Sequence, residues 1–164
     1  MIIKKAYMRM SILRKLHSFK IQQSDMVNIY ILYIRSTLEL SCQVWHYSLT
    51  EEDSSRIERV QKVACRLILK NSYVDYETAL NELKLENLHK RREILCLRFA
   101  KQCVKHPKAS TMFPLKEAIT TETRKKEKYV VQHTRTARLL NSAIPQLQRA
   151  LNNEALKHSK KCKT

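Results

Sequence analysis

The chain has 164 residues, enough for one domain or for a small core with a tail. It contains no glycine, which excludes glycine-rich phosphate loops, dinucleotide-binding fingerprints and the G-x-S-x-G nucleophile elbow, because each needs glycine's positive φ or close backbone approach. Its 32 lysines and arginines against 15 aspartates and glutamates give a net charge of +17.

The positive charge is concentrated at the two ends of the chain. Residues 1–20 carry six basic and no acidic side chains, and residues 106–164 carry thirteen basic and four acidic ones. Residues 51–105 are nearly balanced, with twelve basic and nine acidic side chains. This distribution indicates contact with a polyanion, and we favour nucleic acid over membrane headgroups or acidic proteins.

The chain has no sequence feature of a secreted or membrane protein. Its five cysteines include no C-x-x-C pair, and no apolar signal segment follows Lys4 and Lys5. The longest uncharged apolar run, about residues 26–34, is far shorter than the ~20 residues that a membrane helix needs. We therefore expect reduced thiols, no membrane contact and an intracellular location, in the cytoplasm or nucleus.

Helical periodicity begins at the N-terminus. Residues 3–17 are predicted to form a basic amphipathic helix with Ala6, Met10 and Leu13 on its inner face. A second helix is predicted from about Asp25 to about Leu40, with Ser24 as its N-cap, followed by a tight connector over residues 42–48. The inner stripe expected for this second helix consists of Val27, Ile31, Ile34 and Leu38.

The third helix has the clearest start. Thr50 and the three acidic residues after it form a capping-box pattern, and acidic side chains suit the positive N-terminal end of a helix. Its expected inner face consists of Ile57, Val60, Ala64 and Leu67. The opposite face is basic and consists of Arg59, Lys62, Arg66 and Lys70.

Two further helices are predicted after a turn over residues 71–75. The first spans residues 76–83, and the second runs from an Asn87 cap to about Lys105, where Pro107 prevents its continuation. The buried positions expected are Tyr76, Ala79, Leu80 and Leu83 in the first, and Leu88, Leu95, Phe99 and Cys103 in the second.

The C-terminal third is predicted to be poorer in structure. Residues 108–132 are predicted to form a loop or to be disordered. A short amphipathic helix is expected near residues 144–151, and a free basic end is expected after Lys157. The predicted fold is therefore all-α, with a small helical bundle over residues 1–106 and a basic linker, short helix and partly disordered tail over 107–164.

One segment carries a family resemblance. Residues 32–69 read LYIRSTLELSCQVWHYSLTEEDSSRIERVQKVACRLIL. This resembles the region just after the polymerase palm in jockey-like reverse transcriptases of LINE-type (non-LTR) retrotransposons, where R-x-x-L-E-Y and C-P-V-W-H precede L-E-x-V-Q-K-R-A-x-R-x-I-L-G. The matching residues are Arg35, Leu38, Glu39, Cys42, Val44, Trp45, His46, Ile57, Glu58, Val60, Gln61, Lys62, Ala64, Arg66, Ile68 and Leu69.

The resemblance extends over nearly the whole chain. Residues 4–16 are similar to the family's KKAYxRLxxLRRL, residues 73–80 to Y-x-x-Y-E-x-A-L, and residues 135–145 to the terminal ARTxRYxNSAIP. All of these segments lie downstream of the family's catalytic centre. The resemblance implies a thumb-like bundle that lies along a template–primer duplex and grips phosphate and sugar without reading sequence.

The predicted function is therefore non-catalytic, sequence-independent binding of RNA or DNA, as a fragment of an RNA-directed DNA polymerase. An upstream polymerase palm is a second expected partner. The predicted nucleic-acid-binding residues are Lys4, Lys5, Arg9, Arg14, Lys15, Arg59, Lys62, Arg66 and Lys70. A charged helix face is also the ordinary solvent-exposed state, so this assignment competes with a purely structural one.

No catalytic, metal or cofactor site is expected. Polymerase chemistry needs paired aspartates that hold two metal ions, whereas Asp25, Asp53 and Asp75 are isolated. On one helix, Cys96 and Cys103 would lie about 10 Å apart, too far to share a zinc ion. Trp45 and His46 could stack on a base, although a core role for the tryptophan is favoured.

Two other interpretations remain open. A helical protein-interaction module would use apolar residues left exposed by the missing palm, such as Tyr30, Tyr33 and Trp45. A decayed element copy with no cellular function would explain why the family's glycines and prolines are replaced. The replaced positions are Ser11, Ser41, Gln43, Lys70 and Glu86, and a helix C-cap at Lys70 would favour glycine's left-handed conformation.

Overall fold

The computed structural model describes residues 2–116 and 128–161. Over these ranges the chain consists of helices with connecting turns, and its one extended pairing is an isolated antiparallel bridge between Leu115 and Tyr129. The all-α prediction is confirmed. In the described ranges, no helix combines the length and apolar character required to cross a bilayer.

The chain divides into two compact units. The first unit comprises residues 1–42 and 49–92, and the second comprises residues 43–48 and 93–164. This division differs from the predicted boundary after residue 106, because most of helix α7 (Leu88–Lys105) packs with the C-terminal segments.

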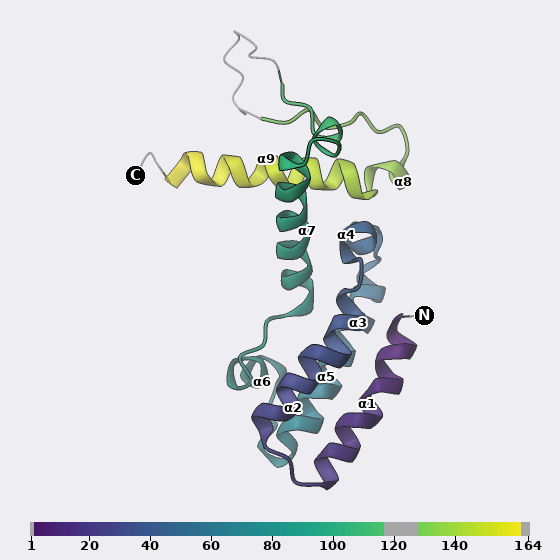
Figure 1. Cartoon of the computed structure of the whole chain (residues 1–164), viewed down its shortest axis with the longest axis vertical. Helices are drawn as coiled ribbons and strands as arrows, with labels where there is room; N and C mark the ends of the chain where they lie inside the picture. The colour runs from purple at the N-terminus through teal and green to yellow at the C-terminus, as the bar shows by residue number, and fades with distance from the viewer. Residues whose placement is uncertain (1, 117–127, 162–164) are drawn as a thin grey trace. The chain divides into compact units, whose positions relative to one another are not determined.

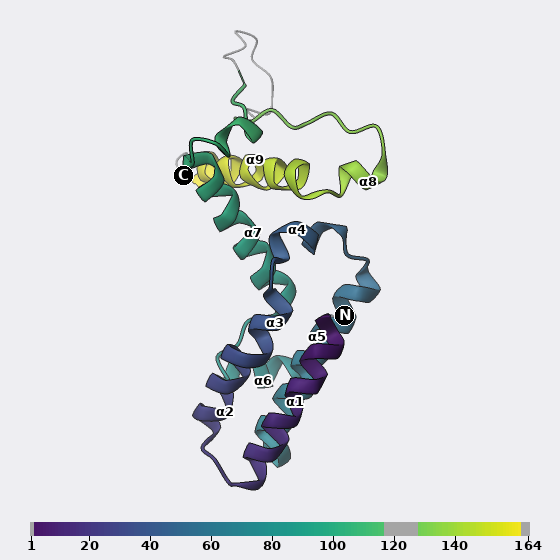
Figure 2. The same ribbon diagram turned by 45° about the vertical axis from the view of Figure 1, so that its right-hand side comes forward.

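The first unit is built on two long helices that lie side by side, α1 (Ile2–Ser18) and α5 (Glu51–Leu69) (Figures 1 and 2). The inner face of α1 is buried at Ala6, Met10 and Leu13, as predicted. The first unit also contains the helical segments α2 (Gln23–Ile29), the π-helical segment η1 (Tyr30–Arg35), α3 (Ser36–Glu39) and α6 (Tyr76–Glu82).

The helical run from α2 through η1 to α3 differs from its predicted register. Its buried stripe is Met26, Tyr30, Ile34 and Leu38, so the prediction was correct for the last two and wrong for Val27 and Ile31, which are half-buried. A π turn pairs residues five apart and adds one residue to the turn, which moves the stripe. The run also begins at Gln23, without the predicted Ser24 cap.

Among the described residues, polar side chains cap the N-terminal ends of α5, α6 and α7, and the caps of α5 and α7 were predicted. Thr50 Oγ1 accepts from the backbone N–H of Asp53 at 3.1 Å and caps α5. Asp75 Oδ1 accepts from Thr78 N–H at 2.9 Å and caps α6. Asn87 Oδ1 accepts from His89 N–H at 2.9 Å and caps α7, as predicted.

Among the residues that the structure describes, four adopt the left-handed backbone region, which glycine favours and which this chain must reach without glycine. They are Lys20, Ser41, Lys70 and Lys84, with φ between 50° and 55°. Lys84 closes α6 in a Schellman motif, since Leu85 N–H bonds Leu80 O and Lys84 N–H bonds Asn81 O. Ser41 and Lys70 are two of the positions at which the family pattern described above has glycine or proline and this chain has another residue.

The second unit is centred on α9 (Ala143–Lys161), which crosses the part of α7 that belongs to this unit (Figure 1). Its core consists of Cys96, Ala100, Phe113, Tyr129, Leu147 and Leu151. The predicted inner stripe of α7 was therefore only partly correct: Phe99 is 41% exposed, and Cys96 and Ala100 take the buried positions. The remaining helical segments of this unit are α4 (Cys42–Trp45), η2 (His46–Ser48), η4 (Ser110–Met112) and α8 (Ala137–Leu140), whereas η3 (Lys70–Ser72) lies in the first unit.

Two buried amide side chains on α9 bind backbone from the segment expected to be loop or disorder. Asn152 Oδ1 accepts from the N–H groups of Lys128 and Tyr129 at 3.1 and 2.9 Å, and its Nδ2 donates to Tyr129 O at 3.0 Å. One turn earlier, Gln148 Oε1 accepts from Gln132 N–H at 2.8 Å. Residues 108–116 and 128–132 are thus ordered, and the predicted stretch over 117–127 lies outside the described residues.

Candidate nucleic-acid interface

The basic face predicted for α5 is present in the structure. Arg59, Lys62, Arg66 and Lys70 are all exposed. They lie opposite the buried face of α5, which consists of Ile57, Val60, Gln61, Ala64, Cys65, Ile68 and Leu69. Leu67 was predicted to be buried and is half-exposed, because Cys65 and Ile68 take the inner positions.

These four cations have no acidic partner among the described residues, unlike Arg56 and Arg91 of the first unit. On the same helix, Arg56 is neutralised by Glu52 at 2.7 Å and by Asp53 at 3.6 Å. Arg91 pairs with Glu39 at 2.5 Å. The N-terminal half of α5 thus carries its own counter-charges, whereas the C-terminal half presents unneutralised positive charge.

Arg59, Lys62 and Arg66 follow the three- and four-residue repeat of one face of α5, and Lys70 comes directly after the helix ends at Leu69. We call these four cations the α5 row. At 1.5 Å rise per residue, Arg59 and Arg66 are about 10 Å apart along the axis. A row of cations on this scale can contact successive phosphates of a nucleic-acid backbone.

Two cations of the row lie over tyrosine rings. Lys62 Nζ is 5.0 Å from the ring centroid of Tyr76, and Arg66 Cζ is 5.2 Å from that of Tyr73. Both distances are within the ~6 Å range of cation–π attraction. Nothing in the sequence identifies these two tyrosines as interface residues, because their contacts with α5 form only when the chain turns back after Leu69.

The ring of Tyr76 is fixed by a partly buried hydrogen-bond network. Its hydroxyl donates to Glu58 Oε1 and accepts from Gln61 Nε2, the latter at 2.9 Å. Burial, with the adjacent Glu58 carboxylate, raises the pKa of Tyr76 well above its ordinary value. The tyrosine therefore stays neutral and held in place beneath Lys62.

The predicted residues of α1 fall into two groups. Lys4, Lys5, Arg14 and Lys15 are exposed. Arg9 is half-buried instead: its Nη1 donates to Tyr33 O at 2.8 Å and to Thr37 Oγ1, and its guanidinium lies over the Tyr33 ring. Arg9 thus fastens α1 to η1 and α3, and this structural role accounts for its position.

Acidic and cysteine residues that might have carried chemistry have structural roles. Asp53 and Asp75 belong to the N-terminal ends of α5 and α6. Cys96 is buried in the core of the second unit and Cys103 packs against that core, in agreement with the expectation of core cysteines. Burial raises the pKa of the Cys65 thiol to about 12, which suppresses the reactive thiolate.

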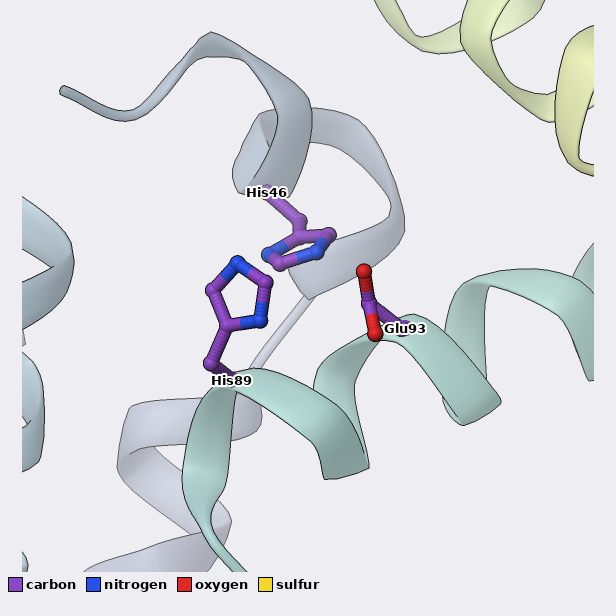
Figure 3. Close-up of side chains that lie close together, drawn as sticks. All are labelled: His46, His89 and Glu93. Carbon is purple, nitrogen blue, oxygen red and sulfur yellow. The ribbon is translucent and has the colours of Figure 1, made fainter. Parts of the chain in front are cut away.

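Figure 3 shows His46, His89 and Glu93. His89 and Glu93 are one turn apart on α7, and ligand atoms of His46 and Glu93, both of the second unit, lie within 4.8 Å of each other. An imidazole and a carboxylate suit zinc, but protein zinc sites use three or four such ligands. We assign no metal to this pair.

Other sequence hypotheses have mixed outcomes. Trp45, considered as a core or base-stacking residue, is half-buried, whereas His46 is buried. Tyr30, considered as an exposed docking residue, is fully buried and cannot form such a surface. Arg124, Lys125 and Lys126, which belong to the predicted basic tail, lie outside the described residues.

Comparison with known protein families, curated proteins and solved structures gives no match to this chain.

Proposed function

We propose that this chain binds nucleic-acid duplexes without sequence preference, through phosphate contacts from the basic faces of α1 and α5. On this proposal it is a non-catalytic, thumb-like part of a LINE-type RNA-directed DNA polymerase, and it acts inside the cell, in the cytoplasm or nucleus. The observation that carries the proposal is the exposed row Arg59, Lys62, Arg66 and Lys70, which has no acidic partner among the described residues.

The chemistry of this row supports phosphate binding in preference to base recognition. Lysine and arginine heads on an exposed helix face suit the charge of a phosphate backbone, and such contacts carry no sequence information. Lys62 and Arg66 already cover the ring faces of Tyr76 and Tyr73, so these two rings are not offered to unstacked bases. Duplexes are therefore the favoured class of ligand.

The test is a salt titration of binding to fluorescent duplexes. Unrelated DNA sequences and an RNA–DNA hybrid of the same length should bind with equal affinity, and log affinity should fall linearly with log salt. Reversing Arg59, Lys62 and Arg66 to Glu should weaken binding equally for all sequences. If each residue neutralises one phosphate, the salt slope should flatten by about three units.

A matched control separates this effect from net charge. Lys90, Arg98 and Lys105 are exposed cations of α7, and reversing them to Glu changes the charge of the chain by the same amount. The control variant should keep most of the affinity and the wild-type slope. Equal losses in the two variants would contradict the proposed site, and so would full binding by the α5 variant.

The C-terminal basic residues provide a rival explanation, because any basic tail attracts nucleic acid. Replacing Arg124, Lys125 and Lys126 by Gln in the full chain should reduce affinity only modestly. If this variant loses all binding while the α5 reversal keeps it, the tail alone binds nucleic acid.

A protein-interaction module is the second candidate function. Leu32 on η1 is 74% exposed and the adjacent Tyr33 is 49% exposed, which is unusual for neighbouring large apolar residues. A polymerase palm is the partner that the family resemblance implies for such a surface. Apolar docking would show little salt dependence, so the same titration distinguishes the two functions.

A further inference from the structure

The four cations of the α5 row differ in how firmly they are held. Lys62 and Arg66 lie over the rings of Tyr76 and Tyr73, at 5.0 and 5.2 Å from their centroids. No such ring contact holds Arg59 or Lys70 among the described residues. The row thus contains two cations that are held on tyrosine rings, Lys62 and Arg66, and two that are not.

A cation that is held on a tyrosine ring loses less side-chain entropy when it binds a ligand. A free lysine or arginine loses rotamer freedom when it is fixed on a ligand, and this loss weakens binding. A side chain already held on a ring has lost part of that freedom before the ligand arrives. Its contacts with the ligand therefore contribute more to affinity.

The geometry of the Arg66 pair allows simultaneous contact with ring and phosphate. A guanidinium meets an aromatic ring with its flat face, whereas it donates hydrogen bonds from its edges. A guanidinium that lies over the Tyr73 ring can therefore keep its edge donors for bidentate bonding to a phosphate. Lys62 has a compact ammonium group with three donors, and these can likewise serve a phosphate while it lies over Tyr76.

Arg9 makes the same kind of ring contact, but its guanidinium is already hydrogen-bonded within the protein. It lies 4.7 Å from the centroid of the Tyr33 ring, but it is half-buried and its Nη1 donates to Tyr33 O and Thr37 Oγ1. Arg66 and Lys62 are exposed and make no such bonds within the described chain. Their polar heads face solvent, where a ligand can reach them.

We infer that Tyr73 and Tyr76 are positioning residues that hold Arg66 and Lys62 for phosphate binding, so these two cations dominate the row. The inference rests on the proposed duplex binding at the same site. It assigns the tyrosines no direct contact with the bases.

Tyr73 provides the cleaner test, because its removal leaves the buried network around Tyr76 intact. Tyr73→Leu in the full chain should weaken duplex binding about two- to fivefold, the equivalent of one exposed cation–π contact. Tyr73→Phe keeps the ring face and should bind like the wild type. Helicity by circular dichroism should be unchanged in both variants.

A double-mutant cycle tests whether Tyr73 acts through Arg66. In the Arg66→Gln background, Tyr73→Leu should cause no further loss, since there is no guanidinium to position. In the Arg59→Gln background, the same change should keep its full two- to fivefold effect. Additive losses with Arg66→Gln, or an equal loss in Tyr73→Phe, would overturn the inference.

Tyr76→Leu gives a second, independent measurement. This variant removes the ring under Lys62, so the folded variant should bind duplexes about two- to fivefold more weakly, and the loss should vanish in the Lys62→Gln background. Full binding by the folded variant would contradict a role for the ring face. If the wild type fails to bind duplexes at all, the proposed function itself fails. If it binds and Tyr73→Leu has no effect, only the present inference fails.

Discussion

The hydroxyl of Tyr30 donates a hydrogen bond to Gln61 Oε1 at 2.6 Å in the core of the first unit, and both side chains are fully buried. The amide nitrogen of Gln61 then donates to the Tyr76 hydroxyl and to Glu86 O, each at 2.9 Å. One glutamine on α5 therefore joins η1, α6 and the connector before α7.

Replacing Gln61 by Leu should destabilise the protein by about 3 kcal/mol. The leucine would leave the Tyr30 hydroxyl and the Glu86 carbonyl without their partner, and each unsatisfied buried group costs about 1–3 kcal/mol. Urea unfolding followed by circular dichroism measures the change. Gln102→Leu, at an exposed position of α7, is the control and should shift stability by less than about 0.5 kcal/mol. Equal stability of the Gln61→Leu and Gln102→Leu variants would contradict the role of the network.

The same core predicts unfolding at alkaline pH. Burial raises the pKa values of Tyr30 and Tyr76 well above the ordinary ~10, and it raises the pKa of Cys65 to about 12. Below about pH 8 these groups are neutral in both the folded and unfolded states. As pH rises further, the unfolded chain releases protons that the folded chain keeps, so the free energy of unfolding falls.

Tyrosinate absorbance near 295 nm provides the measurement for this alkaline transition. Tyr30 and Tyr76 should ionise together with the loss of helical signal. In a Tyr30→Phe variant, the cooperative part of the absorbance change should decrease. Full ionisation of all tyrosines in a protein that remains helical would show that these two residues are not protected.

Local patterns predicted α1 and α5 well. Ala6, Met10 and Leu13 repeat at helical spacing, and Thr50 marks the start of α5, so each feature can be recognised from neighbouring residues alone. The cations of α5 were found in the same way, because a helix face follows from spacing. The π turn over Tyr30–Arg35 has no such signal, and it shifted the buried stripe of its helix.

Contacts between distant residues account for the other differences. The inner face of α7 depends on Phe113, Tyr129 and Leu147, which cover Cys96 and Ala100 from far along the chain. The ordered segment after residue 128 is held by Asn152, 23 residues from Tyr129. Polar amides within an amphipathic helix look like surface residues in the sequence, and only the folded chain shows that they are buried.

Asn152→Ala should therefore loosen the segment that contains Lys128 and Tyr129. The change removes the partner of two backbone N–H groups and one carbonyl, which should cost about 2–3 kcal/mol in the second unit. Hydrogen exchange at the amides of Lys128 and Tyr129 should accelerate by more than tenfold. Asn153→Ala, at the exposed neighbouring position, should leave these amides protected. Slow exchange in both variants would mean that the side chain of Asn152 does not hold the segment.

Replacing Lys70 by glycine should raise the free energy of unfolding, in contrast to the substitutions above, which lower it. Lys70 ends α5 with φ 51° and ψ −115°, a backbone conformation that glycine adopts far more easily than lysine. The lysine stores strain of about 1 kcal/mol or more, which Lys70→Gly should release.

The matched control is Arg59→Gly, which also replaces an exposed cation by glycine but in the regular interior of α5. Here glycine should destabilise by about 1 kcal/mol, since it adds freedom to the unfolded chain. Urea unfolding of the two variants should thus give changes of opposite sign, and Lys70→Ala should give no gain, because alanine carries the same Cβ. Equal losses from both glycine variants would show that Lys70 is not strained. A gain at Lys70 alone would identify the end of α5 as a position where the absence of glycine costs this fold stability.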